Sequence, residues 1–139
     1  MTVLSIEPYL PALRARASEA MLRAYAPYSK FRVGAALLTS DGTIVGGCNV
    51  ENAAYPAGTC AERVALGAAV VSGYQHFTAV VIYSEATTPT PPCGICRQAL
   101  AEFGTTLDVV TVTASGSEAR WTLDELLPHP FTPSKLHTR

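Results

Sequence analysis

The sequence predicts an α/β protein, a three-layer α/β/α sandwich around one mixed five-stranded sheet. Segments with helical periodicity alternate in the middle of the chain with short runs rich in valine and isoleucine. This alternation is typical of folds whose helices cover both faces of a sheet. The 139 residues are enough for one core and contain no internal repeat, low-complexity tract or interior linker. We therefore expect a single domain over residues 1–139.

The first predicted elements are a helix and a hairpin. Small and apolar side chains recur at helical spacing over residues 11–26, with charged side chains between them, and Pro27 ends the pattern. Residues 33–39 and 43–50 predict two strands on either side of a turn that contains Gly42. This glycine can adopt the positive φ that such turns require, so we expect the two strands to be antiparallel.

Two further helices are each ended by a glycine. Residues 60–72 and 93–103 predict helices, and Gly73 and Gly104 stand where each helix would stop. The other predicted elements are strands at 77–83 and 108–113, a weaker strand at 119–122, and a short helix opened by a capping box from Thr122 to Glu125.

The helix over residues 60–72 is unusual because residues 64–71 are apolar on every side. Such a helix must be covered on more than one side, and a chain of this length has little to cover it with. Its small residues would allow a second subunit to approach closely. We therefore expect a homo-oligomer in preference to a monomer.

Composition and charge exclude several classes of protein. The net charge is −1 and only 15% of residues are charged, with lysines and arginines scattered, so binding to a nucleic acid polymer is not expected. The first eight residues lack a basic segment followed by an apolar core, and the longest apolar run, 64–71, is far too short to cross a bilayer. We expect a cytoplasmic protein with no membrane partner.

Two short segments, residues 60–63 and 92–98, offer the ligands of a metal site: Cys60, Cys93 and Cys96. A reducing cytosol and the C-x-x-C spacing favour metal ligation over disulfides for these thiols. Three thiolates leave one position of a tetrahedral zinc ion open to water, whereas a structural zinc usually closes that position with another Cys or His. The sequence therefore favours a hydrolytic site with one Zn²⁺ per subunit.

The remaining thiol and the histidines do not complete this site. Cys48 stands at the end of a predicted strand and is interpreted as a small buried hydrophobic residue. His76, His129 and His137 show no ligand spacing and are expected at the surface or in packing. Each segment alone is a weak signal, because a lone C-x-x-C also occurs in redox sites and in half of a zinc ribbon. The pair of segments is much more specific.

Charged residues close to the cysteines fit hydrolytic chemistry. Cys60 and Cys93 fall at predicted helix N-termini, whose positive ends offset the negative charge of a three-thiolate site. Arg63 and Arg97 lie close to a ligand in sequence and could donate hydrogen bonds to its sulfur. Zinc lowers the pKa of bound water from 15.7 to about 7. Glu62 is expected to act as the catalytic acid and base that takes the proton of this water without binding the metal.

The chain resembles the small cytidine deaminases over nearly its whole length. Five ordered blocks carry the resemblance: Tyr28 to Leu37, Gly47 to Tyr55, Thr59 to Arg63, Pro92 to Gln98 and Leu126 to Phe131. A cysteine rather than a histidine at residue 60 is similar to the nucleoside-acting branch. The resemblance implies zinc-dependent hydrolysis of cytidine and deoxycytidine to uridine and deoxyuridine, with release of ammonia, in pyrimidine salvage. In this reaction activated water attacks C4 of cytosine, and Glu62 moves protons to N3 and then to the departing amine.

The same resemblance implies a substrate site. Asn49 and Glu51 would bind the ribose hydroxyls, Phe31 would flank the pyrimidine, and the backbone around Ala61 would meet the edge of the base. Without the resemblance, residues 49–52 would be interpreted as a polar loop.

Enzymes of this kind are homotetramers in which neighbouring chains complete each site. By that analogy Tyr55 and Phe131 reach the substrate of an adjacent subunit, whereas an aromatic residue near the C-terminus is otherwise most often a packing residue. The chain departs from the commonest pattern at Arg32, where a proline often follows the Phe, and at residues 56–59. Both departures bear on substrate preference.

Three rival functions are left open. One is a deaminase of a modified nucleoside such as blasticidin S, which shares the zinc signature. Another is a non-catalytic zinc module that binds nucleosides or proteins, and a third is a deaminase of free cytosine. Asn49 and Glu51 favour a plain ribose ligand, and Glu62 argues against a non-catalytic module.

Overall fold

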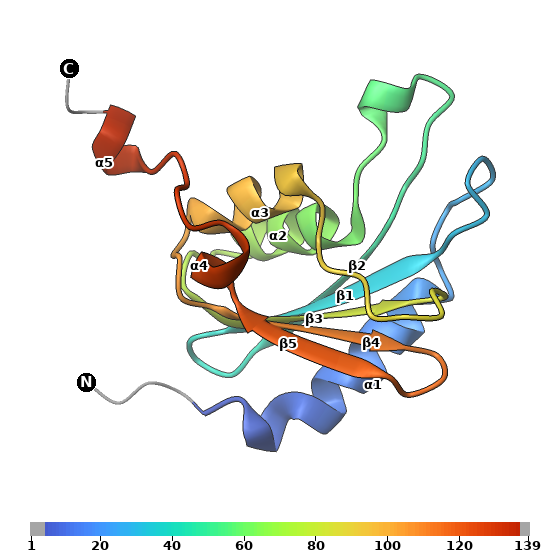
Figure 1. The fold of residues 1–139 in the computed structure, drawn as a ribbon, viewed down its shortest axis with the longest axis horizontal. Helices are drawn as coiled ribbons and strands as arrows, with labels where there is room; N and C mark the ends of the chain where they lie inside the picture. The colour runs from blue at the N-terminus through green and yellow to red at the C-terminus, as the bar shows by residue number, and fades with distance from the viewer. Residues whose placement is uncertain (1–4, 137–139) are drawn as a thin grey trace.

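Five strands form one mixed sheet in the computed structural model, which describes residues 5–136 (Figure 1). Their order across the sheet is β2-β1-β3-β4-β5, where β3 and β4 are parallel and the other neighbours antiparallel. The strands are β1 Val33–Thr39, β2 Ile44–Cys48, β3 Phe77–Ser84, β4 Asp108–Thr113 and β5 Glu118–Thr122. The predicted sheet is confirmed, including its weakly signalled fifth strand.

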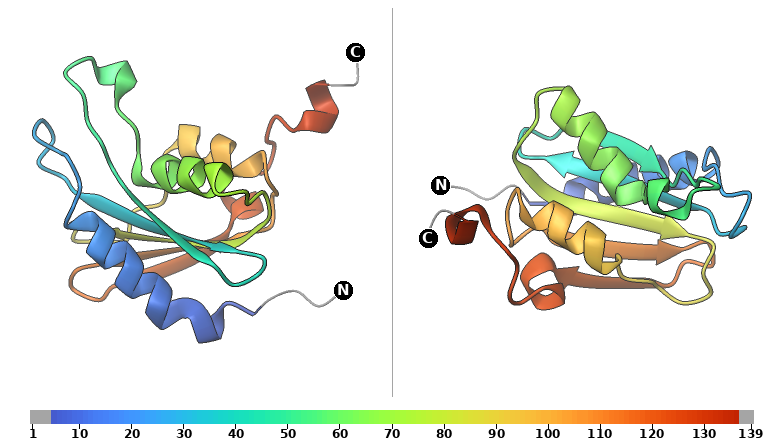
Figure 2. Two further views of the ribbon diagram at one scale, coloured as in Figure 1. Left: turned by 180° about the vertical axis from the view of Figure 1, so that it is seen from behind. Right: turned by 90° about the horizontal axis from the view of Figure 1, so that it is seen from above.

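Helices cover both faces of this sheet. Helix α1, Leu10–Met21, lies on one face, and helices α2, Ala61–Val71, and α3, Gly94–Ala101, lie on the other (Figure 2). The three-layer α/β/α sandwich is therefore confirmed. The short helices are η1 Glu7–Tyr9, η2 Tyr55–Ala57, α4 Leu123–Leu126 and α5 Pro133–Leu136, and of these only α4 was predicted.

Alternate residues of the central strands pack on opposite layers, as the two-residue period of a strand requires. Leu37 and Val80 belong to the core beneath α2 and α3, whereas Leu38 and Val81 belong to the core beneath α1. All four are 0% exposed, so the sheet is buried on both faces at its centre.

Most predicted boundaries hold within two residues. The hairpin turn forms with Gly42 at φ +91°, and Gly73 and Gly104 follow α2 and α3 at positive φ. The capping box is also present, because Thr122 N donates to Glu125 Oε1 at 2.9 Å while the Thr122 side chain bonds the backbone of Glu125.

The first helix is shorter than predicted. The pattern over residues 11–26 favoured a helix up to Pro27, but α1 ends at Met21. Tyr25 leaves the helix to pair with the backbone beyond β2, donating to Asn49 O at 3.0 Å and accepting from Glu51 N at 2.8 Å. These bonds compete with the helix for the same backbone groups, and they tie the end of α1 to residues 49–51.

Helix α2 is covered by the sheet on one side only. Ala65, Leu66 and Ala69 are buried against the sheet, whereas Gly67 is exposed and Val71 is 85% exposed. The expectation that a second subunit covers this side stays a prediction. None of the helices between residues 5 and 136 combines the length and the apolar character needed to cross a membrane.

Candidate metal centre

Two helix N-termini bring three thiols together. Cys60 is the N-cap of α2, Cys93 is the N-cap of α3, and Cys96 lies in the first turn of α3. The two helices pack on the same face of the sheet (Figure 2). As a result, the three sulfur atoms lie within 4.8 Å of one another, although 33 residues separate Cys60 from Cys93.

The separation of the sulfurs fits a tetrahedral zinc ion. Two sulfurs bonded to zinc at about 2.3 Å across a tetrahedral angle would lie about 3.8 Å apart. The Sγ atoms of Cys60 and Cys93 are 3.8 Å apart, and all three cysteines are free. A disulfide would bring two sulfurs to about 2.05 Å. Thiolates are also soft ligands of the kind that zinc accepts, so these residues fit the predicted metal.

Two thiols of the cluster, Cys60 and Cys96, have pKa values that are shifted in opposite directions. A hydrogen bond from the Cys96 thiol, supported by the Arg63 guanidinium 3.7 Å from the Cys60 sulfur, lowers the pKa of Cys60 to about 5. The same contact with Cys60, together with burial, raises the pKa of Cys96. Cys60 therefore gives up its proton more readily than an ordinary thiol and accepts a hydrogen bond from the Cys96 thiol, and a bound cation would displace the proton of Cys96.

Glu62 is a buried carboxyl group beside the cluster. It lies in the first turn of α2 and is only 5% exposed. Burial, followed by the negative charge of Cys60, raises the pKa of Glu62 above its ordinary value. A carboxyl group with a raised pKa accepts a proton more readily than an ordinary carboxylate, which is what the predicted acid and base must do.

The two arginines predicted to assist the metal lie differently. Arg63 donates to the Cys60 sulfur, as predicted. Arg97 instead donates from Nε to Pro92 O at 2.8 Å and from a terminal nitrogen to Leu126 O at 2.9 Å. Its guanidinium thus fastens the loop before Cys93 to the end of α4. Adjacency in sequence pointed to a sulfur contact, but the helical position of Arg97 directs it to these carbonyls.

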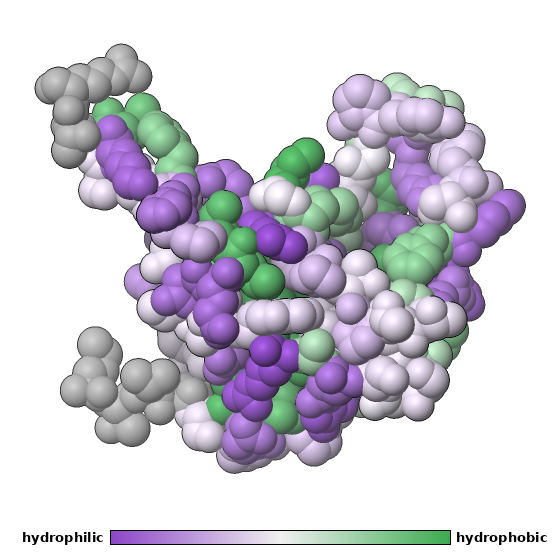
Figure 3. Space-filling model, in the orientation of Figure 1, coloured by the Kyte–Doolittle hydropathy of each residue, from purple (hydrophilic) through white to green (hydrophobic). Residues whose placement is uncertain are grey.

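A cavity of about 300 Å³ opens beside the cluster. Seven of the predicted site residues line it: Phe31, Asn49, Glu51, Cys60, Ala61, Glu62 and Cys93. The space-filling view shows a notch in the surface between the segment that carries η2 and the helices α2 and α3 (Figure 3). A pocket with three cysteines that could hold a metal ion and a buried acid on one side, and polar groups on another, is a typical small-molecule site.

Asn49 is bonded at both ends of its amide. Its Oδ1 accepts from Val33 N at 2.9 Å, and its Nδ2 donates to Phe31 O at 2.9 Å. Asn49 Oδ1 retains one lone pair, and Nδ2 retains one hydrogen, with which to bind a ligand. Asn49 therefore both faces the cavity and orients the segment that contains Phe31.

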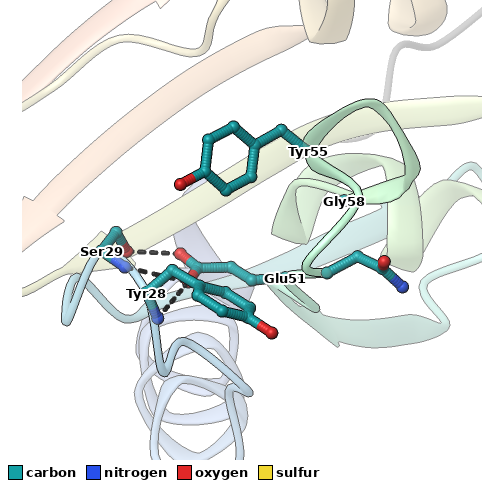
Figure 4. A pocket seen from close by; sticks show the side chains of 6 residues that line it. Tyr28, Ser29, Glu51, Tyr55 and Gly58 are labelled. Carbon is teal, nitrogen blue, oxygen red and sulfur yellow. Dashed lines mark hydrogen bonds between the residues drawn. The ribbon is translucent and has the colours of Figure 1, made fainter.

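Glu51 holds the turn at residues 28–29. One carboxylate oxygen accepts from Tyr28 N at 3.1 Å and Ser29 N at 3.0 Å, and the other accepts from the Ser29 hydroxyl (Figure 4). These bonds lower the pKa of Glu51, and the bond from the Ser29 hydroxyl has the largest effect. The carboxylate is therefore ionised at neutral pH. Ser29 Oγ also accepts from Phe31 N at 3.0 Å. The turn and the cavity wall therefore form one hydrogen-bonded unit.

The two aromatic residues predicted to reach a neighbouring subunit lie outside this cavity. Tyr55 is 78% exposed and meets Tyr28 edge to face, with ring centroids 6.4 Å apart, across a second pocket that shares Ser29 and Glu51 (Figure 4). Phe131 is 57% exposed, and its backbone bonds the Gln98 side chain at 2.7 and 3.2 Å. Their predicted role in an oligomer stays a prediction.

The other residues considered from sequence take no part in the cluster. Cys48 is half-buried at the end of β2, and His76 and His129 are exposed. His137 lies outside the described residues, as do residues 1–4.

Part of the cavity wall was not predicted from the sequence. Ser84, at the carboxyl end of β3, lines the cavity together with Ser29, Val33, Ile82, Thr90, Pro91 and Pro92. A signal was available for Ser84, since ligands of α/β sheets bind beyond the carboxyl ends of the strands. The role of Ser29 depends on contacts with residues 31 and 51, which the local sequence does not indicate.

Comparison with known proteins is consistent with this geometry. A family model described as the zinc-binding region of cytidine and deoxycytidylate deaminases matches residues 11–113. A cytidine deaminase from Sporosarcina psychrophila is 44% identical over 125 residues, covering 89% of this chain and 92% of the relative. A crystal structure of cytidine deaminase from Burkholderia pseudomallei is 46% identical, with a TM-score of 0.84, and the match covers 87% of this chain and 98% of that one.

A relative with a different substrate in its name is more distant. The blasticidin-S deaminase of Bacillus cereus is 30% identical over 112 residues, which covers 75% of this chain and 79% of the relative.

Proposed function

The chain belongs to the family of cytidine and deoxycytidylate deaminases, and we propose on this basis that it hydrolyses cytidine and deoxycytidine to uridine and deoxyuridine, releasing ammonia. The observation that carries this function is the buried carboxyl group of Glu62 beside three converging thiols, at the edge of a cavity with polar groups. The conversion requires water to replace an amino group, so it needs a site that activates water and moves protons.

Cys60, Cys93 and Cys96 would hold one zinc ion per subunit. Their sulfur spacing and the two helix N-termini beside them support this assignment. When bound, zinc would act as a Lewis acid that lowers the pKa of a water molecule from 15.7 to about 7. The Arg63 guanidinium donates to one sulfur and withdraws part of the negative charge that three thiolates bring.

Glu62 would carry the protons. It accepts a proton from the attacking water, delivers it to N3 of the pyrimidine, and passes a second proton to the amino group at C4. The oxygen of water thereby becomes bonded to C4, the C4–N bond breaks, and the nitrogen leaves as ammonia. Burial favours this role because it raises the pKa of the carboxyl group and so makes it a better proton acceptor.

The opposite part of the cavity would hold the sugar and the base. Asn49 and Glu51 offer an amide and an ionised carboxylate to the ribose hydroxyls. Phe31 would flank the pyrimidine, and the backbone at Ala61 would meet its edge. Ser29 supports both ends of this arrangement, because its hydroxyl donates to Glu51 and accepts from Phe31 N.

The proposed assembly is a homotetramer in which neighbours complete each site. The exposed side of α2 and the exposed Tyr55 and Phe131 support it, because large apolar side chains at the surface favour contact with another subunit. The cytoplasm is the proposed compartment, since free metal-ligating thiols need a reducing environment.

The test compares the wild-type protein with Glu62→Gln for ammonia release and for zinc content in the same samples. Gln has nearly the shape of Glu but cannot carry the proton. We expect turnover to fall by about 10²–10⁴-fold with the zinc content unchanged. Substantial residual turnover in the variant would refute the role of Glu62.

Substrates are compared in a panel of cytidine, deoxycytidine, free cytosine and blasticidin S. Turnover of the two nucleosides supports the proposal. A clear preference for blasticidin S or free cytosine would assign a different deaminase, and a zinc-loaded wild-type protein that releases no ammonia would favour a non-catalytic module.

A further inference from the structure

An ion pair joins the two strand ends that border the cavity. In the antiparallel ladder between β1 and β3, the last pair is Val33 with Ser84. The next residue outward on each strand is therefore Arg32 and Glu85. Phe31 and Val33 line the cavity on the side of β1, and Ser84 lines it on the side of β3. The ion pair therefore lies beside the cavity, at the point where the chain segments before β1 and after β3 separate.

Arg32 and Glu85 are bonded through three donors. Arg32 Nε donates to Glu85 Oε1 at 2.8 Å, a terminal guanidinium nitrogen donates to the same oxygen, and the Arg32 backbone N donates to Oε2 at 3.2 Å. The bond from the Arg32 backbone N–H extends the pairing of β1 and β3 by one residue, with the Glu85 carboxylate as acceptor in place of a backbone carbonyl. The Arg32 side chain also holds the pKa of Glu85 below its ordinary value, so the carboxylate is ionised at neutral pH.

Arg32 and Glu85 each adjoin, along the chain, a segment that lines the cavity. Arg32 follows Phe31, whose carbonyl and N–H are held by Asn49 and Ser29. Glu85 begins the loop that ends at Pro92 and Cys93, which line the cavity beside the metal-ligating cluster. A change in the distance between residues 32 and 85 therefore changes the distance between the wall that carries Phe31 and the loop that carries a metal ligand.

We propose that Arg32 and Glu85 are positioning residues that hold these two walls at the separation the nucleoside requires, and so set KM. This inference rests on the proposed function. Neither side chain lines the cavity that the described residues form, so both act through their neighbours.

The expected effect is modest and sensitive to salt. The two side chains are 40% and 31% exposed, and pairs with such exposure contribute little and are screened by ions. Breaking the pair should raise KM by about 1.5–5-fold while kcat stays within about two-fold. Because the nucleoside carries no net charge, screening of the substrate itself does not produce a salt-dependent KM.

The experiment measures kcat and KM for cytidine, with zinc content, in Arg32→Gln, Glu85→Gln and the double variant at 50 and 500 mM NaCl. We expect each single variant to raise KM, and the double variant to raise it no more than either single change. The wild-type KM should approach the variant value at high salt, and the KM of Glu85→Gln should change little.

Arg14→Gln is the matched control. Arg14 pairs with Glu118 at 2.8 Å with similar exposures of 38% and 33%, but on the opposite side of the sheet from the cavity. Its removal should leave KM unchanged. An unchanged KM in Glu85→Gln, additive effects in the double variant, or an equal effect of Arg14→Gln would each overturn the inference while the proposed function stands. A wild-type protein without nucleoside turnover would overturn the proposed function and this inference with it.

Discussion

Substituting Gly47 by alanine should damage catalysis from outside the cavity. Gly47 lies on β2, directly beneath helix α2. A Cβ atom at this position would lie 2.4 Å from Ala65 N and 2.7 Å from Ala61 O. Both are backbone atoms of α2, which cannot rotate away as a side chain could.

The size of the disturbance follows from these distances. Ordinary contacts of a Cβ atom begin at 3.4 Å, so α2 would have to move by about 1 Å. Ala61 begins α2, Cys60 caps it and Glu62 lies in its first turn, so the shift moves the proposed metal ligand Cys60 and the proposed proton carrier Glu62 relative to α3. A misplacement of about 1 Å can cost about 10²-fold in rate. Overpacking of this kind typically destabilises a protein by about 1–3 kcal/mol.

Gly46→Ala is the control for Gly47→Ala. A Cβ atom at Gly46 would approach only the Arg16 side chain, with Nε at 2.7 Å, and that flexible end can move aside. The assays are kcat/KM for cytidine, zinc content and thermal unfolding of both variants. We expect a loss of about 10²-fold in kcat/KM for Gly47→Ala and wild-type behaviour for Gly46→Ala. A Gly47→Ala protein with wild-type kcat/KM, or equal losses in both variants, would refute the reasoning.

Three further predictions concern the metal and the fold. Cys93→Ala should lose zinc, measured by elemental analysis, and should unfold at lower temperature because metal binding and folding are coupled. Zinc added to the metal-free protein at pH 7 should release protons, because the pKa of Cys96 is raised and only its thiolate binds metal. Calorimetry in buffers of different ionisation enthalpy measures this release. For the same reason, the affinity for zinc should rise with pH. Thr122→Ala removes half of the capping box of α4 and should lower the free energy of unfolding by about 1 kcal/mol in denaturant titrations. Retained zinc in Cys93→Ala, a binding enthalpy independent of buffer, or an unchanged unfolding midpoint in Thr122→Ala would contradict the respective prediction.

Local sequence patterns were sufficient for the five strands, for the helices α2, α3 and α4, and for the identity of the candidate ligands, but not for the end of α1 or for the short helices η1, η2 and α5. Cys93 and Cys96 are one helical turn apart, and Cys60 stands next to Ala61 and Glu62, so the chemistry of each segment is visible within a few residues. The turn at Gly42 and the capping box at Thr122 are equally local, because each depends on φ or on a bond that spans three residues. The short β5 was only weakly indicated, since its five residues include exposed positions and its pairing with β4 supplies much of its order.

Only the tertiary structure decided which distant residues meet. The order of the strands brings α2 beside α3 and so joins Cys60 to Cys93, and it places Arg32 opposite Glu85, 53 residues away. Tertiary contacts also decide that α1 ends at Met21, because the backbone of Tyr25 is bonded to residues 49–51. Periodicity and capping are properties of neighbouring residues, whereas strand pairing and side-chain contacts between segments depend on how the whole chain packs. The sequence therefore determined the chemical groups of this protein, and the packing of the sheet with its helices determined their geometry.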